Sequence, residues 1–240
     1  MKRKTSNRPL IKTVGLAVAG LILSAGSIAL ADETVVVSGT APEKASGLYN
    51  AFEIGIGAGY SQGVGDVGKN VPSLTDSGGA GTSLELDLGW RIDPHFLVGI
   101  YGTGAWFSTG DAPGNAFNNW SATAGVQGAY HFLPGENLDP WISLGTGWRG
   151  YWVNRPEGRD SRHGLDLARL HVGLDVPVTN GVAVSPFVGA SATLFLTQQL
   201  AQETSFTDIQ DRKVSVFLNA GVMGRFDLLG SPAPSKATEL

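Results

Sequence analysis

The sequence predicts an all-β protein, an eight-stranded antiparallel up-and-down transmembrane β-barrel. Three observations predict it: segments in which apolar and polar residues alternate, connections that are alternately long and short, and aromatic residues near the segment ends. Alternation with a period of two is the pattern of a strand with one apolar face. Alternating long loops and short turns, with aromatic girdles around a lipid-facing band, are typical of membrane barrels.

The last alternating stretch, residues 215–228, shows the strand pattern most clearly. Its even-numbered positions include Leu218 and Val222, and its odd-numbered positions include Arg225 and Asp227. A soluble barrel would turn the charged residues toward water, whereas a membrane barrel turns the apolar residues toward lipid and keeps a polar interior. Alternation alone does not choose between them, so the connections and the aromatic residues decide in favour of the membrane barrel.

Residues 1–31 have the order of a secretory signal peptide. Five basic residues precede the apolar stretch VGLAVAGLILSAG, and the small residues around Ala29 and Ala31 follow it. This order predicts cleavage after Ala31. The apolar stretch is shorter than the ~20 residues of a membrane-spanning helix. An exported barrel is expected in the outer membrane of a Gram-negative cell.

The mature chain is acidic and contains no cysteine. Without residues 1–31 it has 12 basic and 21 acidic residues, a net charge of −9. This charge disfavours a nucleic-acid partner, which requires a basic face. No disulfide can form, so the fold itself must provide the stability. No later apolar run is long enough for a membrane helix, so any insertion must use strands.

Residues 32–50 are predicted to form a periplasmic leader of mostly polar and small residues. Within it, the sequence ETVVVSG, which includes the segment from Glu33 to Ser38, resembles the TonB box of TonB-dependent transporters. That box pairs as an added strand with a partner protein. The resemblance implies a periplasmic partner for the leader, although those transporters have a plug domain and a far larger barrel.

Eight strands are expected, each at least as long as the ~9–11 residues that a tilted membrane strand needs. They cover residues 51–62, 82–92, 96–108, 120–133, 141–153, 165–178, 182–198 and 214–228. The first, third, fifth and seventh connections are long and the others are short. With eight strands, both termini of the barrel segment then lie at the short-turn end. Binding at the surface is expected on the long loops, especially residues 63–81 and 199–213.

The outward aromatic residues form two groups that match the two interfaces of a bilayer. The predicted lipid-interface aromatics are Tyr60, Trp106, Trp120 and Trp152 near the long loops and Trp90, Phe96, Phe132 and Phe226 near the short turns. The strand at residues 96–108 fits least well, because Leu97, Tyr101 and Phe107 have the inward parity.

These features together resemble the small outer-membrane β-barrels of the OmpA/OmpX type, over residues 51 to about 228. The signal sequence, the eight segments, the aromatic groups and the terminal strand ending VMGRFDL carry the resemblance. It implies outer-membrane lipid as a partner and the barrel-assembly machinery during biogenesis. Chains of this family commonly end with an aromatic residue that the assembly machinery recognises. Here the barrel, residues 51–229, is followed by a predicted tail, residues 230–240.

The interior of an eight-stranded barrel is just wide enough for side chains to fill it. Buried charges must be paired, so the inward charges are predicted to form a structural network in the lumen. Its members are Glu53, Glu85, Asp87, Arg91, Arg149, Arg169, His171, Asp175, Arg225 and Asp227. The alternative is a narrow pore for ions or small solutes.

Catalysis and cofactor binding have little support in the sequence. Some small outer-membrane barrels remodel lipid A with a serine, a histidine and an acid, which act only when each orients the next. His131, His171, Ser143 and Ser191 share the inward parity, but no His-x-Ser pair occurs. The acids of the long loops lack the spacing of a calcium loop. No glycine loop leads into a helix, as a phosphate site requires. We therefore predict no enzyme, no cofactor and no metal.

The predicted function is that of a non-enzymatic outer-membrane barrel with a polar, side-chain-filled interior and four surface loops, in a structural or surface-interaction role. A soluble periplasmic carrier of lipocalin type is the alternative from another class, because such a barrel holds a ligand in its interior. That carrier would need the apolar parity inside.

Overall fold

The computed structural model describes residues 48–109 and 118–232. The predicted signal peptide, the segment from Glu33 to Ser38 and most of the predicted tail lie outside the described residues. No helix in the described part is long and apolar enough to cross a membrane.

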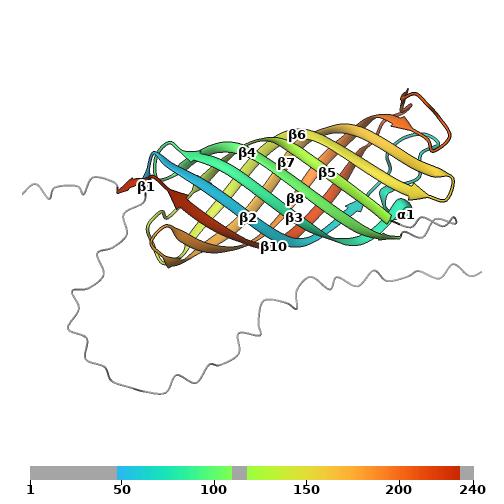
Figure 1. Cartoon of the computed structure of the whole chain (residues 1–240). Helices are drawn as coiled ribbons and strands as arrows, with labels where there is room; N and C mark the ends of the chain where they lie inside the picture. The colour runs from blue at the N-terminus through green and yellow to red at the C-terminus, as the bar shows by residue number, and fades with distance from the viewer. Residues whose placement is uncertain (1–47, 110–117, 233–240) are drawn as a thin grey trace, which may run out of the picture. The chain divides into compact units, whose positions relative to one another are not determined.

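The predicted eight-stranded antiparallel barrel is confirmed (Figure 1). Its strands are β2 (Ala51–Val64), β3 (Gly78–Arg91), β4 (Phe96–Thr109), β5 (Asn118–His131), β6 (Asp139–Arg155), β7 (Gly158–Thr179), β8 (Val182–Gln199) and β10 (Val214–Leu228). Each of these strands pairs with the next one along the chain, and β10 also pairs with β2. This last pairing closes the barrel and removes both open edges.

Three short elements lie at the barrel ends. The strand β1 (Leu48–Tyr49) pairs with β11 (Ser231–Pro232) beside the start of β2 (Figure 1). Asn50 and Leu229, which separate these strands from β2 and β10, have φ angles of 50° and 61°, a left-handed conformation that interrupts a strand. At the opposite, long-loop end, β9 (Thr207–Asp208) pairs with β8, and the helix α1 (Leu74–Ser77) lies in the β2–β3 loop.

The apolar residues of the barrel strands face outward. In β10, Leu218 and Val222 are 44% and 52% exposed, whereas Arg225 is only 5% exposed. The same outward parity continues around the wall through Ile56, Leu86, Ile100, Val126, Leu144, Leu170 and Val188. A soluble monomer rarely exposes so continuous an apolar surface. This sidedness is the opposite of what a lipocalin-like carrier requires, so that alternative is wrong.

Strand β7 changes parity part-way along its length. Leu165 and Leu167 face outward, and so does Leu170, which has the other parity. A register shift between Asp166 and Ala168 in the pairing with β8 accounts for the change. Such a bulge inserts one residue and re-aims the side chains beside it. Asp166 consequently points into the lumen and is fully buried.

The long-loop end of the lumen is apolar, which corrects the expectation of a polar interior throughout. Phe107, Tyr151, Phe195 and Phe217 from four barrel strands pack with their ring centroids 5.7–6.5 Å apart. Two long loops fold inward over these rings and bury Val67, Val71 and Leu74 from the β2–β3 loop and Ile209 from the β8–β10 loop. We refer to these four loop residues as the loop cap.

Hydrogen bonds hold the two loops of the cap against each other. Lys213 N donates to Val67 O and Lys69 N donates to Gln210 O, each at 2.9 Å. Arg162 Nη1 donates to Ser77 Oγ at 3.3 Å at the end of α1. On the surface, the hydrogen bond from Lys213 Nζ to Asp66 and the charge of that carboxylate raise the pKa of Lys213. The two longest loops are therefore ordered parts of the barrel end.

Inward-facing glycines make room for the large side chains of the lumen. A Cβ atom at Gly173 would lie 2.5 Å from the ring of Trp141, and one at Gly189 would lie 2.1 Å from the ring of His171. Both distances are far shorter than a carbon–carbon contact at optimal separation, about 3.5–4.0 Å. The glycines of these strands thus complement the aromatic rings that cross the narrow interior.

Candidate functional site: the barrel lumen

All ten residues of the predicted charge network lie on the lumen side of the wall. Asp227 is half-buried and the other nine are buried. The structure adds two buried carboxylates that sequence reasoning left out of the network, Asp139 and Asp166. His131, expected only to supply hydrogen bonds, is fully buried and paired with Asp139. The charges are arranged in three layers between the short turns and the long loops.

The first layer lies at the short-turn end. Arg91 forms an ion pair with Glu53, and Arg91 Nε lies 3.6 Å from Asp227 Oδ1. Arg225 Nη1 lies 3.2 Å from Glu53 Oε1, so Glu53 joins both arginines. The Arg225 guanidinium also lies over the ring of Trp141, 4.2 Å from its centroid.

The middle layer contains Arg169, Glu85, Asp87 and His171. Arg169 forms an ion pair with Glu85 and donates a hydrogen bond to Gln127 Oε1 at 2.5 Å. Its guanidinium lies 4.1 Å from the centroid of the Tyr101 ring. His171 stacks on Phe187 with the ring centroids 5.1 Å apart.

The third layer lies below the apolar end of the lumen. Arg149 Nε and Nη2 donate to the two carboxylate oxygens of Asp166, each at 2.8 Å. Thr193 Oγ1 donates to the same carboxylate at 2.5 Å. The Arg149 guanidinium lies 3.9 Å from the centroid of the Phe217 ring.

One arrangement therefore recurs in all three layers: an arginine paired with a carboxylate and stacked on an aromatic ring. A cation over an aromatic face is stabilised by the ring quadrupole, and more so where water is excluded. The rings are those of Trp141, Tyr101 and Phe217. Sequence reasoning missed their role, although the signal was present as aromatic residues on the charged parity.

The outward aromatic residues are placed at both ends of the wall. Strand register puts Trp106, Trp120 and Trp152 side by side on β4, β5 and β6, and the rings of Trp120 and Trp152 stack 3.9 Å apart. Tyr60 lies at the same level, across Thr82 of β3. Near the short turns, Trp90, Phe96, Phe132 and Phe226 are 38–52% exposed.

The inward serines and histidines do not form a hydrogen-bonded relay among the described residues. Ser143 faces His171 across the β6–β7 ladder. His171 Nε2 and Ser191 Oγ are buried without a hydrogen-bond partner. A triad requires a histidine that contacts both the serine and the acid. Among the described residues, the inward serines therefore lack the hydrogen-bonded histidine that a triad needs.

A closed antiparallel barrel with an apolar wall, aromatic residues toward both rims and an ionic interior is the architecture of a transmembrane β-barrel. No protein-family profile and no curated protein matches the chain. Solved structures of small barrels are similar to it. Neisserial surface protein A is 16% identical, with a TM-score of 0.46 over 75% of this chain and 98% of its own.

Two further solved structures with the same kind of similarity are outer membrane proteins. AlkL is 18% identical, with a TM-score of 0.47 over 81% of this chain and 99% of its own. OprG from Pseudomonas aeruginosa is 13% identical, with a TM-score of 0.44 over 74% of this chain and 97% of its own. At these identities the similarity concerns the fold alone.

Proposed function

We propose that the protein is a non-enzymatic barrel of the outer membrane that holds its long loops at the cell surface, in a structural or surface-interaction role. The observation that carries this proposal is the lumen, which is filled with paired charges and closed at the long-loop end by the loop cap. A filled barrel leaves the loops as the part available for recognition.

The partners that follow from this role are outer-membrane lipid around the wall and the barrel-assembly machinery during biogenesis. The exposed apolar side chains on the outward face support lipid as a partner, because such a surface is stable in hydrocarbon. A periplasmic partner of the segment from Glu33 to Ser38 stays a prediction.

Cysteine labelling on intact cells tests the location and the orientation together. The chain has no cysteine, so a single introduced thiol gives a signal without background. We expect Ser205→Cys, exposed in the β8–β10 loop, to react with a membrane-impermeant maleimide on intact cells. Asn180→Cys, exposed in the β7–β8 turn, should react only after the envelope is opened. The reverse pattern, or equal labelling of both, would refute the proposed topology.

The filled lumen also predicts that the barrel does not conduct ions. Purified protein reconstituted in a planar bilayer should give no current steps above the lipid background, because paired charged side chains and the loop cap occupy the lumen. Reproducible steps from a preparation that shows heat-modifiable migration on a gel would instead support the narrow-pore alternative.

A further inference from the structure

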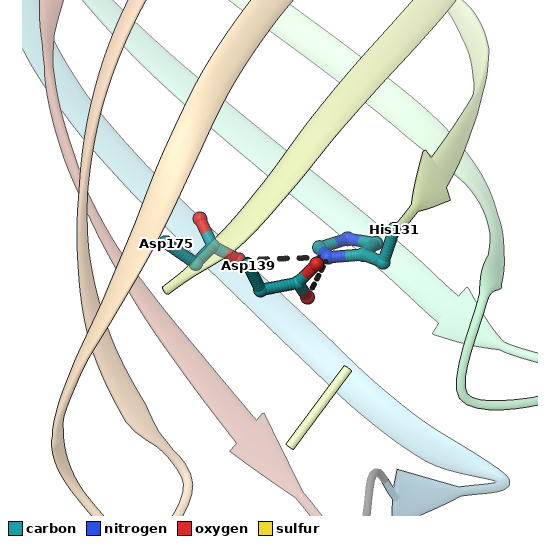
Figure 2. Close-up of side chains that lie close together, drawn as sticks. All are labelled: His131, Asp139 and Asp175. Atoms are coloured by element: carbon teal, nitrogen blue, oxygen red, sulfur yellow. Dashed lines mark hydrogen bonds and ion pairs between the residues drawn. The ribbon is translucent and has the colours of Figure 1, made fainter. Parts of the chain in front are cut away.

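We propose that the short-turn end of the lumen binds a divalent transition-metal ion between the side chains of His131, Asp139 and Asp175. These residues come from three consecutive strands, β5, β6 and β7, and Figure 2 shows their side chains converging on one point inside the barrel. All three are buried, and one ligand atom from each lies within 4.8 Å of the others.

The strand register builds this cluster. Asp139 and Asp175 are direct partners in the β6–β7 ladder. Two like charges placed opposite each other on neighbouring strands destabilise a sheet unless something lies between them. His131 pairs with Trp141, two residues beyond Asp139 on the same face of β6, which brings the imidazole beside both carboxylates.

The distances fit a metal with one nitrogen and two oxygen ligands. His131 Nδ1 lies 2.8 Å from Asp139 Oδ2 and 3.6 Å from Asp175 Oδ2. In a tetrahedral zinc site with bonds of about 2.0–2.2 Å, neighbouring ligand atoms are about 3.3–3.5 Å apart. The first of the two measured distances is shorter than this range and the second is slightly longer, so a small shift of the side chains would bring both into it. Imidazole together with carboxylate suits Zn²⁺ better than Mg²⁺ or Ca²⁺.

The charged groups around His131 carry an excess of negative charge that a divalent cation would neutralise. Around His131 the layer holds four carboxylates, on Glu53, Asp139, Asp175 and Asp227, and two guanidiniums, on Arg91 and Arg225. With a neutral imidazole these groups sum to a net charge of −2, which a single divalent ion balances. Buried charge without compensation is costly, so such an ion would stabilise the layer.

Two observations point to a ligand at this place. Asp175 is only 7% exposed, yet its Oδ1 atom has no hydrogen-bond partner. A cavity of about 300 Å³ opens at the short-turn end and is lined by Asp139, Asp175 and Asp227, so two of the three proposed ligands border a space that can hold water. The fourth ligand position can then be taken by water from this cavity.

Binding of the metal would change the contact between Arg225 and His131. Its Nη1 atom lies 3.2 Å from His131 Nε2, and a guanidinium can only donate, so in this arrangement the imidazole proton is on Nδ1. The metal replaces that proton, which moves to Nε2. Arg225 should then turn from His131 toward Glu53, whose Oε1 already lies 3.2 Å from Nη1.

The test is calorimetric titration of the refolded barrel in detergent with Zn²⁺ alone, in a buffer that does not bind metal. We expect one ion per chain, and no displacement by Mg²⁺ in excess. Asp139→Asn and Asp175→Asn keep the side-chain shape and should weaken binding at least about tenfold. A heat-modifiability gel establishes that each variant is folded.

Asp227→Asn is the matched control, because it removes one charge from the same end of the barrel without removing a ligand. It should weaken binding by a clearly smaller factor than Asp139→Asn does, because it removes one charge of the layer and no ligand atom. Equal losses in Asp227→Asn and Asp139→Asn, ready displacement by Mg²⁺, or no Zn²⁺ binding by the folded wild-type barrel would each overturn the proposal.

Discussion

Replacement of Asp166 by asparagine is expected to destabilise the folded barrel by about 3–5 kcal/mol, because it leaves the Arg149 charge buried without a counter-ion. Asp166 is fully buried and accepts two hydrogen bonds from Arg149 and one from Thr193. Asparagine has nearly the same volume, so the lost stability measures the missing charge and not the creation of a cavity. The free energy of unfolding from reversible urea titration in lipid vesicles measures it.

The exposed pair of Lys213 and Asp66 provides a matched control. Its nitrogen–oxygen distance is also 2.8 Å, but both side chains are about 60% exposed. Asp66→Asn should therefore cost less than about 1 kcal/mol. Joint replacement of Arg149 by methionine and Asp166 by leucine should recover most of the stability lost in Asp166→Asn. A cost below about 1 kcal/mol for Asp166→Asn would contradict the buried-pair account.

Truncation of Phe217 to alanine is expected to cost about 3–5 kcal/mol, the range for a large aromatic side chain in a packed core. The Phe217 ring is fully buried, contacts the rings of Phe107, Tyr151 and Phe195, and carries the Arg149 guanidinium on its face. The same urea titration measures the loss.

Leu218→Ala separates packing inside the barrel from contact with lipid. Leu218 is the next residue in β10, faces outward and is 44% exposed. Lipid chains can fill the space that its truncation leaves, so only the transfer free energy is lost, about 1–2 kcal/mol. If Leu218→Ala cost as much as Phe217→Ala, the apolar end of the lumen would not be a packed core.

The eight strands could be predicted because lipid and lumen impose a period of two on each strand, which in β7 is shifted by one residue at the bulge. The expected and observed strands differ by a few residues at their ends, most of all in β7, which begins at Gly158 and not near residue 165. The missed part belongs to a hairpin with β6 that extends beyond the alternating segment. Its polar and charged residues carry no lipid-facing pattern.

The partners within the lumen were harder to predict. Asp166 was missed because the bulge in β7 reverses the parity that sequence reasoning carries along the strand. The loop cap was missed because Val67, Leu74 and Ile209 are isolated apolar residues in polar loops. The meeting of His131 with Asp139 and Asp175 depends on register across three strands, which the alternation does not determine.

The sidedness of the wall underlies the whole account, and photolabelling from the lipid phase tests it without any mutation. Phospholipids with a photoactivatable carbene precursor in the acyl chain would be crosslinked to the reconstituted barrel, and the modified residues of β10 identified by mass spectrometry. We expect adducts at Leu218, Val222 and Phe226, which are 38–52% exposed, and none at Phe217 or Met223, which are at most 1% exposed. Adducts at Met223 and Arg225 with Leu218 and Val222 protected would contradict the account.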